Sequence, residues 1–260
     1  MKRIVTTIIA ASALALMSSA ANAKEWKTVR IGVEGAYPPF SSVTPAGELV
    51  GFDIEIAKAL CKQMGVKCTM VQQDWDGIIP ALLARKYDAI IASMSITEER
   101  KKKVAFSDKY YNTPAKFARK KDSGIEISKA GLKGKTVGVQ RATTHDNFIS
   151  AEFGDSVAIK RYATQDEAYL DAVAGRLDLL LADSVAMTDG FIATDKGKDW
   201  ELAGPGYTDP KYFGDGVGIA IRKRDTDLVE MFNKAIAGIR ADGTYKKINA
   251  KYFAFDVYGN

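Results

Sequence analysis

Short apolar runs and amphipathic stretches alternate along most of this 260-residue chain. An apolar run of a few residues between turn signals predicts a strand, and apolar residues every three or four positions predict a helix. In its first part, the pattern predicts strands at 28–33, 67–71 and 88–92 and helices at 53–64 and 76–84. Pro80 falls within the last of these helices, and we place it in the first turn, where a missing amide is tolerated.

A second series of elements follows a break in the pattern. It predicts strands at 135–140, 157–162 and 177–182 and helices at 144–153, 165–174 and 185–194. An irregular stretch then runs from Gly204-Pro205-Gly206 to Gly216, because glycine and proline interrupt regular structure. The remainder predicts a strand at 217–222 and helices at 226–241 and 244–252.

Both series share one plan, in which strands and helices alternate and the last strand is a buried apolar run ending in polar residues. Such alternation is typical of an α/β fold with largely parallel sheets. We therefore expect two Rossmann-like lobes, with the chain crossing between them near 112–118 and 206–216. Lobe I is then discontinuous, and two connecting strands form a hinge that permits closure. The predicted boundaries are 24–112 and 217–260 for lobe I and 113–216 for lobe II.

The first 23 residues are typical of an export signal. Lys2 and Arg3 precede an apolar stretch at 4–17, and Ala21-Asn22-Ala23 fits the small-residue cleavage pattern. The stretch is shorter than the ~20 apolar residues that a membrane span needs, and no later segment approaches that length. No cysteine follows the signal to accept a lipid. We expect cleavage after about Ala23 and a soluble protein outside the cytoplasm.

Charge and cysteine content narrow the function classes further. Removal of the two basic signal residues lowers the formal charge from +5 to +3. The basic residues form no stripe with aromatic residues, which argues against a nucleic-acid partner, and nothing indicates an obligate oligomer, so we expect a monomer. Cys61 and Cys68 suit a structural disulfide in an oxidising compartment, with two buried free thiols as the alternative. No cluster has metal-ligand spacing, and no cofactor is expected.

Small hydroxylated residues and an arginine follow the predicted strand at 88–92. Open α/β sheets place their ligands at the carboxyl ends of strands, where Ser93 and Ser95 offer hydroxyls. Arg100 offers a planar guanidinium that matches a carboxylate in two parallel hydrogen bonds. The alternative is a simple helix start, with Thr97 as the cap and Arg100 in solvent.

Two further segments of this half carry candidate binding residues. Glu34 stands where the first strand ends, with Tyr37 a turn away, and a carboxylate beside an aromatic ring suits a cationic or amide side chain. Trp75 lies between two acids just before a helix and suits a stacking wall of a cleft. The alternatives are an exposed glutamate, a packing tyrosine and an indole that covers the core from a loop.

The second half offers a similar set. Thr143 and Thr144 open a predicted helix, where they are good N-caps, and His145 follows them. The same helix start presents free amides and a positive dipole end to an anion. Asp183 ends the strand at 177–182, where it caps the next helix, accepts from an α-ammonium, or does both.

At this point the chain resembles a known family. The motifs are EGAYPPF, GFDIEIAKALCKQMGVKC, SMSITEER, GKTVGVQ-x-x-TTHDNF, GRLDLLLAD and GTYKKINAKYF. Together they are similar to the periplasmic solute-binding proteins of polar amino-acid ABC importers, closest to the arginine and the lysine/arginine/ornithine/histidine binders. The resemblance covers essentially the whole mature chain. It implies the type II periplasmic binding protein fold, a trapped free amino acid, a membrane ABC permease with its ATPase as partner, and the disulfide between Cys61 and Cys68.

The resemblance also implies how the common part of an amino acid is held. Arg100 holds the α-carboxylate, supported by Ser95 and Thr144. Asp183 holds the α-ammonium, and Thr143 lines the site.

For the variable side chain, the resemblance implies a slot lined by rings. Tyr37 and Trp75 sandwich the side chain, and Glu34 with Ser93 meets its distal end. His145 lies at the edge of the site in lobe II. Arginine is favoured, with lysine, ornithine and histidine as the other ligands of this class.

The chain departs from its relatives at several positions. Ala142 stands where close relatives usually have glycine, which predicts a slightly reshaped loop. Arg141 before it either repels a basic ligand or points to solvent. Ala92 removes one hydroxyl, and Glu34 in place of aspartate shortens the pocket.

Two other function classes share this scaffold. A lyase or dehydratase using only carboxylates is one, although the chain has a single histidine and no nucleophile elbow, metal spacing or phosphate loop, and we expect no enzyme. A soluble ligand-sensing module is the other. A binder returns its ligand unaltered, whereas an enzyme does not.

Overall fold

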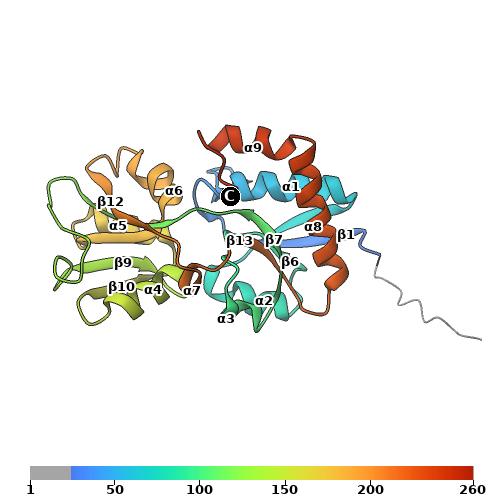
Figure 1. Cartoon of the computed structure of the whole chain (residues 1–260). Helices are drawn as coiled ribbons and strands as arrows, with labels where there is room; N and C mark the ends of the chain where they lie inside the picture. Colours follow the sequence, from blue (N-terminus) through green and yellow to red (C-terminus); the bar gives the residue numbers. More distant parts are fainter. Residues whose placement is uncertain (1–24, 260) are drawn as a thin grey trace, which may run out of the picture.

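Two five-stranded sheets, each packed with helices, form two lobes in the computed structural model, which describes residues 25–259 (Figure 1). The predicted export signal at 1–23 lies outside the described residues. The α/β class and the two lobes that the sequence predicts are confirmed. In the order in which they pair, the strands are β5-β1-β6-β13-β7 in lobe I and β10-β9-β11-β8-β12 in lobe II.

Lobe I contains the first sheet, a small three-stranded sheet and the longest helices. Its main sheet consists of β1 (Thr28–Val33), β5 (Lys67–Gln72), β6 (Ala89–Ile90), β7 (Ala105–Tyr111) and β13 (Val217–Ile221). The small sheet consists of β2 (Ala36–Tyr37), β3 (Ser41–Val43) and β4 (Leu49–Val50). The helices are α1 (Phe52–Met64), the 3₁₀ turn η1 (Trp75–Gly77), α2 (Ile78–Leu83), α3 (Glu98–Lys101), α8 (Thr226–Ala241) and α9 (Thr244–Tyr252).

Lobe II contains the second sheet and shorter helices. Its strands are β8 (Ala115–Lys120), β9 (Thr136–Gln140), β10 (Ala158–Tyr162), β11 (Leu179–Asp183) and β12 (Trp200–Tyr207). Its helices are α4 (Thr144–Phe153), α5 (Gln165–Val173), α6 (Ser184–Met187), the π-helical turn η2 (Thr188–Ile192) and α7 (Pro210–Phe213), which packs on α4.

Each sheet is parallel apart from one strand. In lobe I, β13 pairs antiparallel with β6 and β7. In lobe II, β8 pairs antiparallel with β11 and β12. The chain enters each of these reversed strands directly after it passes from one sheet to the other, from β7 to β8 and from β12 to β13. The two sheets therefore have the same plan, and the prediction of largely parallel sheets holds except for one strand in each.

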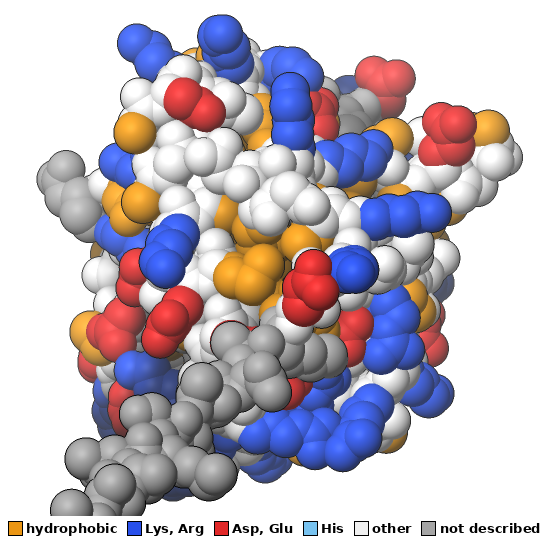
Figure 2. All heavy atoms as spheres, turned by 90° about the vertical axis from the view of Figure 1, so that its right-hand side faces the viewer, with side chains coloured by type: hydrophobic (Ala, Val, Ile, Leu, Met, Phe, Trp, Pro, Cys, Tyr) orange, Lys and Arg blue, Asp and Glu red, His pale blue; other side chains and the backbone are white. Residues whose placement is uncertain are grey.

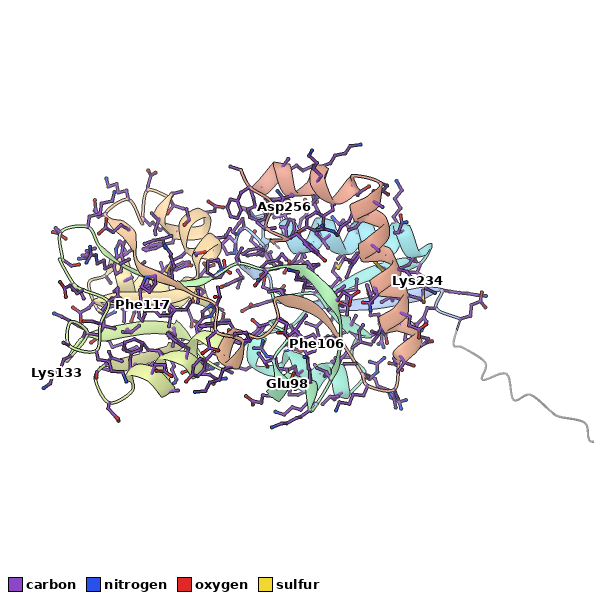
Figure 3. The ribbon with its side chains drawn as sticks, in the orientation of Figure 1. Glu98, Phe106, Phe117, Lys133, Lys234 and Asp256 are labelled. Atoms are coloured by element: carbon purple, nitrogen blue, oxygen red, sulfur yellow. A yellow bond between two sulfur atoms is a disulfide. The ribbon has the colours of Figure 1, made fainter. Side chains whose placement is uncertain are left out.

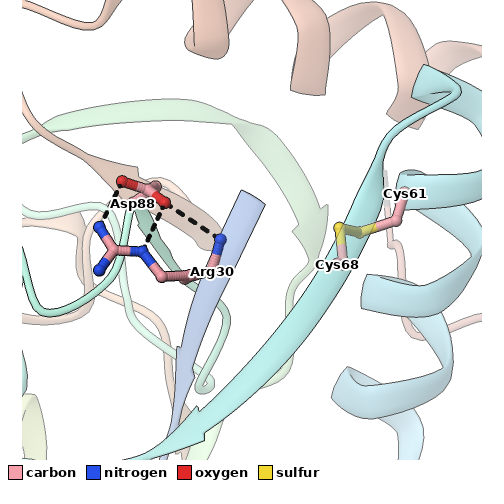
Figure 4. Close-up of a disulfide and its surroundings, with 4 residues drawn as sticks. All are labelled: Arg30, Cys61, Cys68 and Asp88. Atoms are coloured by element: carbon pink, nitrogen blue, oxygen red, sulfur yellow. Dashed lines mark hydrogen bonds and ion pairs between the residues drawn. A yellow bond between two sulfur atoms is a disulfide. The ribbon is translucent and has the colours of Figure 1, made fainter. Parts of the chain in front are cut away.

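Helix α1 shows how local sequence sets an element. Apolar residues on one face of α1 are buried, and the helix ends at Gly65, whose φ of 68° is accessible to glycine at little cost. The Gly65 and Val66 amides bond back to the last carbonyls of the helix. The predicted disulfide is present: Cys61 near the end of α1 is bonded to Cys68 on β5, with Cα atoms 6.0 Å apart (Figure 4).

A charged cluster secures the end of the lobe I sheet that lies away from the carboxyl ends of β1 and β6. Arg30 on β1 donates two hydrogen bonds of 3.1 Å to the carboxylate of Asp88, just before β6 (Figure 4). Arg222, which follows β13, donates to the same carboxylate at 3.0 Å. These pairs lower the pKa of Asp88, although its burial acts in the opposite direction.

Three predicted elements are wrong in detail. The strand predicted at 88–92 is limited to Ala89–Ile90, because the chain turns at Ser93 with a φ of 52°. The helix predicted at 76–84 is divided into η1 and α2, since Pro80 has no amide to bond to the carbonyl of Asp76. Pro80 does lie in the first turn of α2, as predicted. The helix predicted at 185–194 is divided into α6 and the π-helical turn η2.

The stretch around Gly204-Pro205-Gly206 is also not irregular, contrary to prediction, because it lies within β12. Proline cannot donate to a sheet, but β12 is an edge strand, and its register with β8 shifts between Ala203 and Tyr207. The sequence predicts no bounds for strands β7 and β8, although the predicted crossing at 112–118 overlaps the start of β8. Charged residues such as Lys109 and Arg119 interrupt their apolar alternation.

Each lobe has an apolar core, and the main cluster of lobe I also includes Val185 and Ala186 of α6 from lobe II. Aromatic rings pack within both cores, with Phe40 stacked on Tyr111 in lobe I and Phe148 against Tyr207 in lobe II. Figure 3 labels one phenylalanine from the sheet of each lobe, Phe106 and Phe117. In Figure 2, Lys and Arg side chains are spread over the end of lobe I with Asp and Glu between them. No helix in residues 25–259 is long and apolar enough to cross a membrane.

Candidate functional site: a cavity between the lobes

The carboxyl ends of strands from both sheets meet at a cavity of about 420 Å³ between the lobes. Glu34 follows β1 and Ser93 lies shortly after β6, while Gln140 and Asp183 are the last residues of β9 and β11. Every residue that the sequence singles out as a binding candidate lines this cavity: Glu34, Tyr37, Trp75, Ser93, Ser95, Arg100, Thr143, Thr144, His145 and Asp183. Tyr37 and Asp183, which are 146 positions apart in the chain, are thus brought together by the two lobes.

Glu34 is a buried carboxylate whose hydrogen-bond partner is neutral. The side-chain amide of Gln140 donates to Glu34 Oε1 at 2.6 Å, and only 6% of Glu34 is exposed. In residues 25–259 no lysine or arginine forms an ion pair with it. Burial raises the pKa of Glu34 to about 7, and although the Gln140 bond opposes this, nearby acids such as Asp166 add to it. A cation placed beside Glu34 would restore the ionised form.

Arg100 and Trp75, also from lobe I, line the same cavity. The Arg100 guanidinium donates to the backbone oxygen of Ser95 at 3.0 Å and lies 5.2 Å from the centre of the Trp75 ring. Desolvation lowers the pKa of Arg100 to about 10, so it remains cationic at neutral pH. In the described part of the chain no carboxylate forms an ion pair with Arg100. The N-cap by Thr97 that the sequence offered as an alternative is present too, with its side chain accepting from the Arg100 amide.

Ser93 is held in an unusual backbone conformation by a residue that sequence reasoning missed. Its φ of 52° is rare for a residue other than glycine. The amide and the hydroxyl of Ser93 both donate to Asp53 Oδ2, at 2.8 and 3.0 Å, and Tyr110 donates to the other oxygen. Burial raises the pKa of Asp53 to about 7, which these bonds oppose. The one signal in the sequence is an acid on the buried face of α1.

Lobe II contributes the start of α4. Thr143 is the N-cap, accepting from the amide of Asp146 at 3.1 Å, so the capping interpretation of this residue is correct. Thr144 and His145 follow in the first turn and line the cavity with it. Burial and the nearby Arg100 lower the pKa of His145 to about 3, which keeps the imidazole neutral at physiological pH.

Asp183 combines a structural contact with a place in the cavity. Its Oδ1 accepts from the amides of Val185 and Ala186 at 2.8 and 3.1 Å, which caps α6, and the Thr113 hydroxyl donates to its other oxygen. Burial raises the pKa of Asp183 to about 6 against these bonds. The Asp183 amide donates to the hydroxyl of Tyr37 at 3.3 Å, which joins the lobes.

The loop before α4 corrects the expectation for Arg141. Its guanidinium neither faces the ligand cavity nor points freely to solvent, because it pairs with Asp76 of lobe I. The two residues are 65 positions apart, so their pairing has no local signal in the sequence. Ala142 has a left-handed backbone with φ of 58°, a conformation that glycine adopts at little cost and that other residues rarely adopt.

Several cavity residues had no prominent signal in the sequence. Gln140 donates to Glu34 and to the backbone oxygen of Ala163, and both partners became evident only in the folded chain. Other unpredicted lining residues lie on or near the two connections between the sheets. They include Lys109, Tyr111, Asn112, Thr113, Thr208, Pro210, Phe213, Gly214, Asp215, Gly216 and Val217. Among residues 25–259 no group of three His, Cys, Asp or Glu side chains could hold a metal ion.

A cavity between two α/β lobes, reached by strands that cross twice, defines a type II periplasmic binding protein. Residues 29–255 match the bacterial extracellular solute-binding proteins, family 3, and the chain belongs to this family.

Relatives in this family support the assignment. The chain is 54% identical to the L-arginine-binding protein of Pseudomonas aeruginosa, over 97% of this chain and 96% of that one. It is 46% identical to the lysine/arginine/ornithine-binding periplasmic protein of Escherichia coli, over 98% and 99%. Among solved structures, an ancestral arginine-binding protein bound to arginine has a TM-score of 0.81 at 38% identity, covering 88% of this chain and 99% of that one. These relatives are binding proteins and not enzymes.

Proposed function

We propose that the protein binds one free basic amino acid between its lobes, with L-arginine preferred over lysine, ornithine and histidine. The observation that supports this most is the pair of unpartnered opposite charges in one cavity. Buried Glu34 has no cation beside it, and Arg100 has no carboxylate in the described residues. A ligand with a carboxylate at one end and a cation at the other satisfies both charges. The L-arginine-binding protein of Pseudomonas aeruginosa and the ancestral arginine-binding protein bound to arginine support the choice of ligand.

In this proposal the head of the amino acid lies between Arg100 and Asp183, one from each lobe. Arg100 binds the α-carboxylate in two charge-assisted hydrogen bonds, with Ser95 and Thr144 as further donors. The carboxylate of Asp183 accepts from the α-ammonium while it continues to cap α6. Thr143 lines the same end.

The side chain of the ligand then extends toward Glu34. Tyr37 and Trp75 flank it, and an aromatic face contributes about 0.5–2 kcal/mol to a desolvated cation. Glu34 accepts from the guanidinium with Ser93 beside it. Neutral His145 closes the site from lobe II without repelling a cation.

We further propose how the protein works in the cell. Residues 24–112 and 217–260 form one lobe and 113–216 the other, and the crossings near 112–118 and 206–216 are the hinge about which they close. The export signal is cleaved after about Ala23, and the protein is a periplasmic monomer. A membrane permease with its ATPase recognises the closed form, in which both lobes are presented together, and bound ligand raises the population of that form.

Isothermal titration calorimetry with a matched ligand set tests the binding proposal. We expect L-arginine to bind. Agmatine, which lacks the α-carboxylate, and L-glutamine, which lacks a cationic side chain, are expected to bind far more weakly. Glu34→Gln weakens arginine binding about 10- to 100-fold, because a charge-assisted hydrogen bond is lost, and changes glutamine binding little. Glu98→Gln on exposed α3 is the control.

If Glu34→Gln lost the same factor in affinity for arginine and for glutamine, the proposed contact between Glu34 and the ligand side chain would be wrong. Proton spectra of arginine after long incubation with the protein test the alternative of a lyase, since a binder returns the ligand unchanged. A new product that forms in proportion to protein concentration would overturn the proposal.

A further inference from the structure

Two neighbouring residues of lobe I, Trp75 and Asp76, contact two neighbouring residues of lobe II, Arg141 and Ala142, directly across the cleft. The indole nitrogen of Trp75 donates to the backbone oxygen of Ala142 at 3.1 Å. The Arg141 guanidinium donates to the carboxylate of Asp76. Both contacts span the cleft directly, with no other element between them.

The lobe II half of these contacts is fixed from behind. The Arg141 amide donates to the backbone oxygen of Tyr162 at 3.0 Å, and the Ala142 amide donates to Asp146 Oδ2 at 3.3 Å. Ala142 itself is in the left-handed region, with φ of 58°. This conformation costs a residue with a Cβ roughly 1 kcal/mol, and it directs the Ala142 carbonyl across the cleft.

The lobe I half belongs to the short 3₁₀ turn η1. The Gly77 amide donates to the backbone oxygen of Asp74 at 3.1 Å, and α2 follows directly. Trp75 is shared between two cavities. It lines the ligand cavity and also a second cavity of about 500 Å³, whose lining includes Asp76 and Ala142. Trp75 therefore lies between the two cavities, and Asp76 and Ala142 line the second one.

We infer that Trp75, Asp76, Arg141 and Ala142 form a latch that holds the lobes together without ligand and slows the release of a bound one. The part of this inference that concerns ligand release rests on the proposed function. The latch contributes an ion pair and a neutral hydrogen bond. Asp76, Arg141 and Ala142 do not line the ligand cavity, whereas Trp75 does. The ion pair therefore adds to the affinity for every ligand and does not select among them.

The exposure of the pair sets the size of the effect. The side chain of Arg141 is 47% exposed and that of Asp76 is 36% exposed, so water and salt screen their attraction. An exposed ion pair changes an equilibrium constant about two- to fivefold, and a neutral hydrogen bond about two- to tenfold. The latch thus shifts the closed population without locking it.

Distances between spin labels on the two lobes test the latch in ligand-free protein. Lys133 and Lys234 lie in lobe II and on α8 of lobe I, far apart in Figure 3, and both are exposed. Lys133→Cys and Lys234→Cys take the labels cleanly, because both native cysteines are in the disulfide. Double electron–electron resonance then gives the populations of shorter and longer separations.

Arg141→Met removes the charge and keeps the length of the side chain, and Trp75→Phe removes the indole donor but keeps a ring over Arg100. Each variant is expected to lower the ratio of the short to the long population, about two- to fivefold for Arg141→Met and two- to tenfold for Trp75→Phe. In about 1 M NaCl the effect of Arg141→Met disappears, while that of Trp75→Phe remains. Arg176→Met, which breaks an ion pair within lobe II, leaves the ratio unchanged.

Superimposable distance distributions for native protein and both latch variants would overturn the inference. A second measurement follows labelled arginine as it is displaced by excess unlabelled arginine. Arg141→Met and Asp76→Asn are each expected to speed the release of arginine to the same degree. The double variant is expected to release arginine no faster than either single variant, because all three lose the same ion pair. Absence of arginine binding to native protein would refute the proposed function, and the distance measurement would still decide the latch.

Discussion

Replacing Glu34 by glutamine is expected to make the ligand-free protein more stable while it weakens ligand binding. The substitution keeps the shape of the side chain, and the new amide oxygen can accept from Gln140 as Glu34 Oε1 does at 2.6 Å. What disappears is a buried negative charge that no cation neutralises. Stability and binding therefore change in opposite directions at one residue.

The pH dependence follows from linkage. Burial raises the pKa of Glu34 from 4.5 to about 7, so between these values the folded protein holds a proton that the unfolded chain has lost. Stability of the native protein therefore falls as pH rises through this window, and the full loss is present above about pH 7. At about 1.4 kcal/mol per pKa unit, the charge costs about 3 kcal/mol at about pH 8.

Guanidinium unfolding followed by circular dichroism, at several pH values without ligand, measures the effect. We expect Glu34→Gln to be more stable than native protein by up to about 3 kcal/mol at about pH 8, or about 6–12 °C in Tm. The gain shrinks toward zero as the pH falls below 4.5, where Glu34 is protonated in both the folded and the unfolded state. Asp53 and Asp183 titrate in native and variant alike, so the difference isolates Glu34.

The exposed residue Glu98 provides the control, since Glu98→Gln is expected to stay within about 0.5 kcal/mol of native protein at every pH. A Glu34→Gln variant that is no more stable than native protein at about pH 8, or whose stability changes with pH in parallel with it, would refute this reasoning.

Three further experiments test other parts of the molecule. Arg100→Ala is expected to abolish calorimetric binding of every amino acid, because the α-carboxylate loses its charge-assisted pair, and unchanged affinity would remove Arg100 from the site. Cys61→Ser with Cys68→Ser is expected to lower the free energy of unfolding by about 2–3 kcal/mol in denaturant titrations, whereas equal stability would show that the bond constrains nothing. His145, whose pKa burial lowers to about 3, is expected to give imidazole NMR shifts that stay constant from about pH 8 to 5, and a titration midpoint near 6.5 would show an exposed ring.

Much of the fold could be predicted from the chain because its signals are local. The ranges of α4, α8 and α9 agree with their predicted ranges, since each has apolar residues at helical spacing between clear start and stop residues. Strands β7, β8 and β12 escaped prediction because their neighbours, and not their own patterns, make them strands. β12 contains Gly-Pro-Gly and forms only because an edge position requires no amide from Pro205.

The candidate site divides in the same way. Glu34, Arg100 and Asp183 stand next to strand or helix ends, where position in an α/β fold already marks a residue, and all line one cavity. Asp53 and Arg141 act through partners 40 and 65 positions away, which no local pattern encodes. Their roles required the folded chain.

A crystal structure of the protein grown with L-arginine tests most directly whether opposite charges from the two lobes hold the head of one amino acid. We predict one arginine molecule between the lobes, with its carboxylate on Arg100, its α-ammonium on Asp183 and its guanidinium at Glu34. An arginine bound in the reverse direction, or bound outside this cavity, would contradict that prediction.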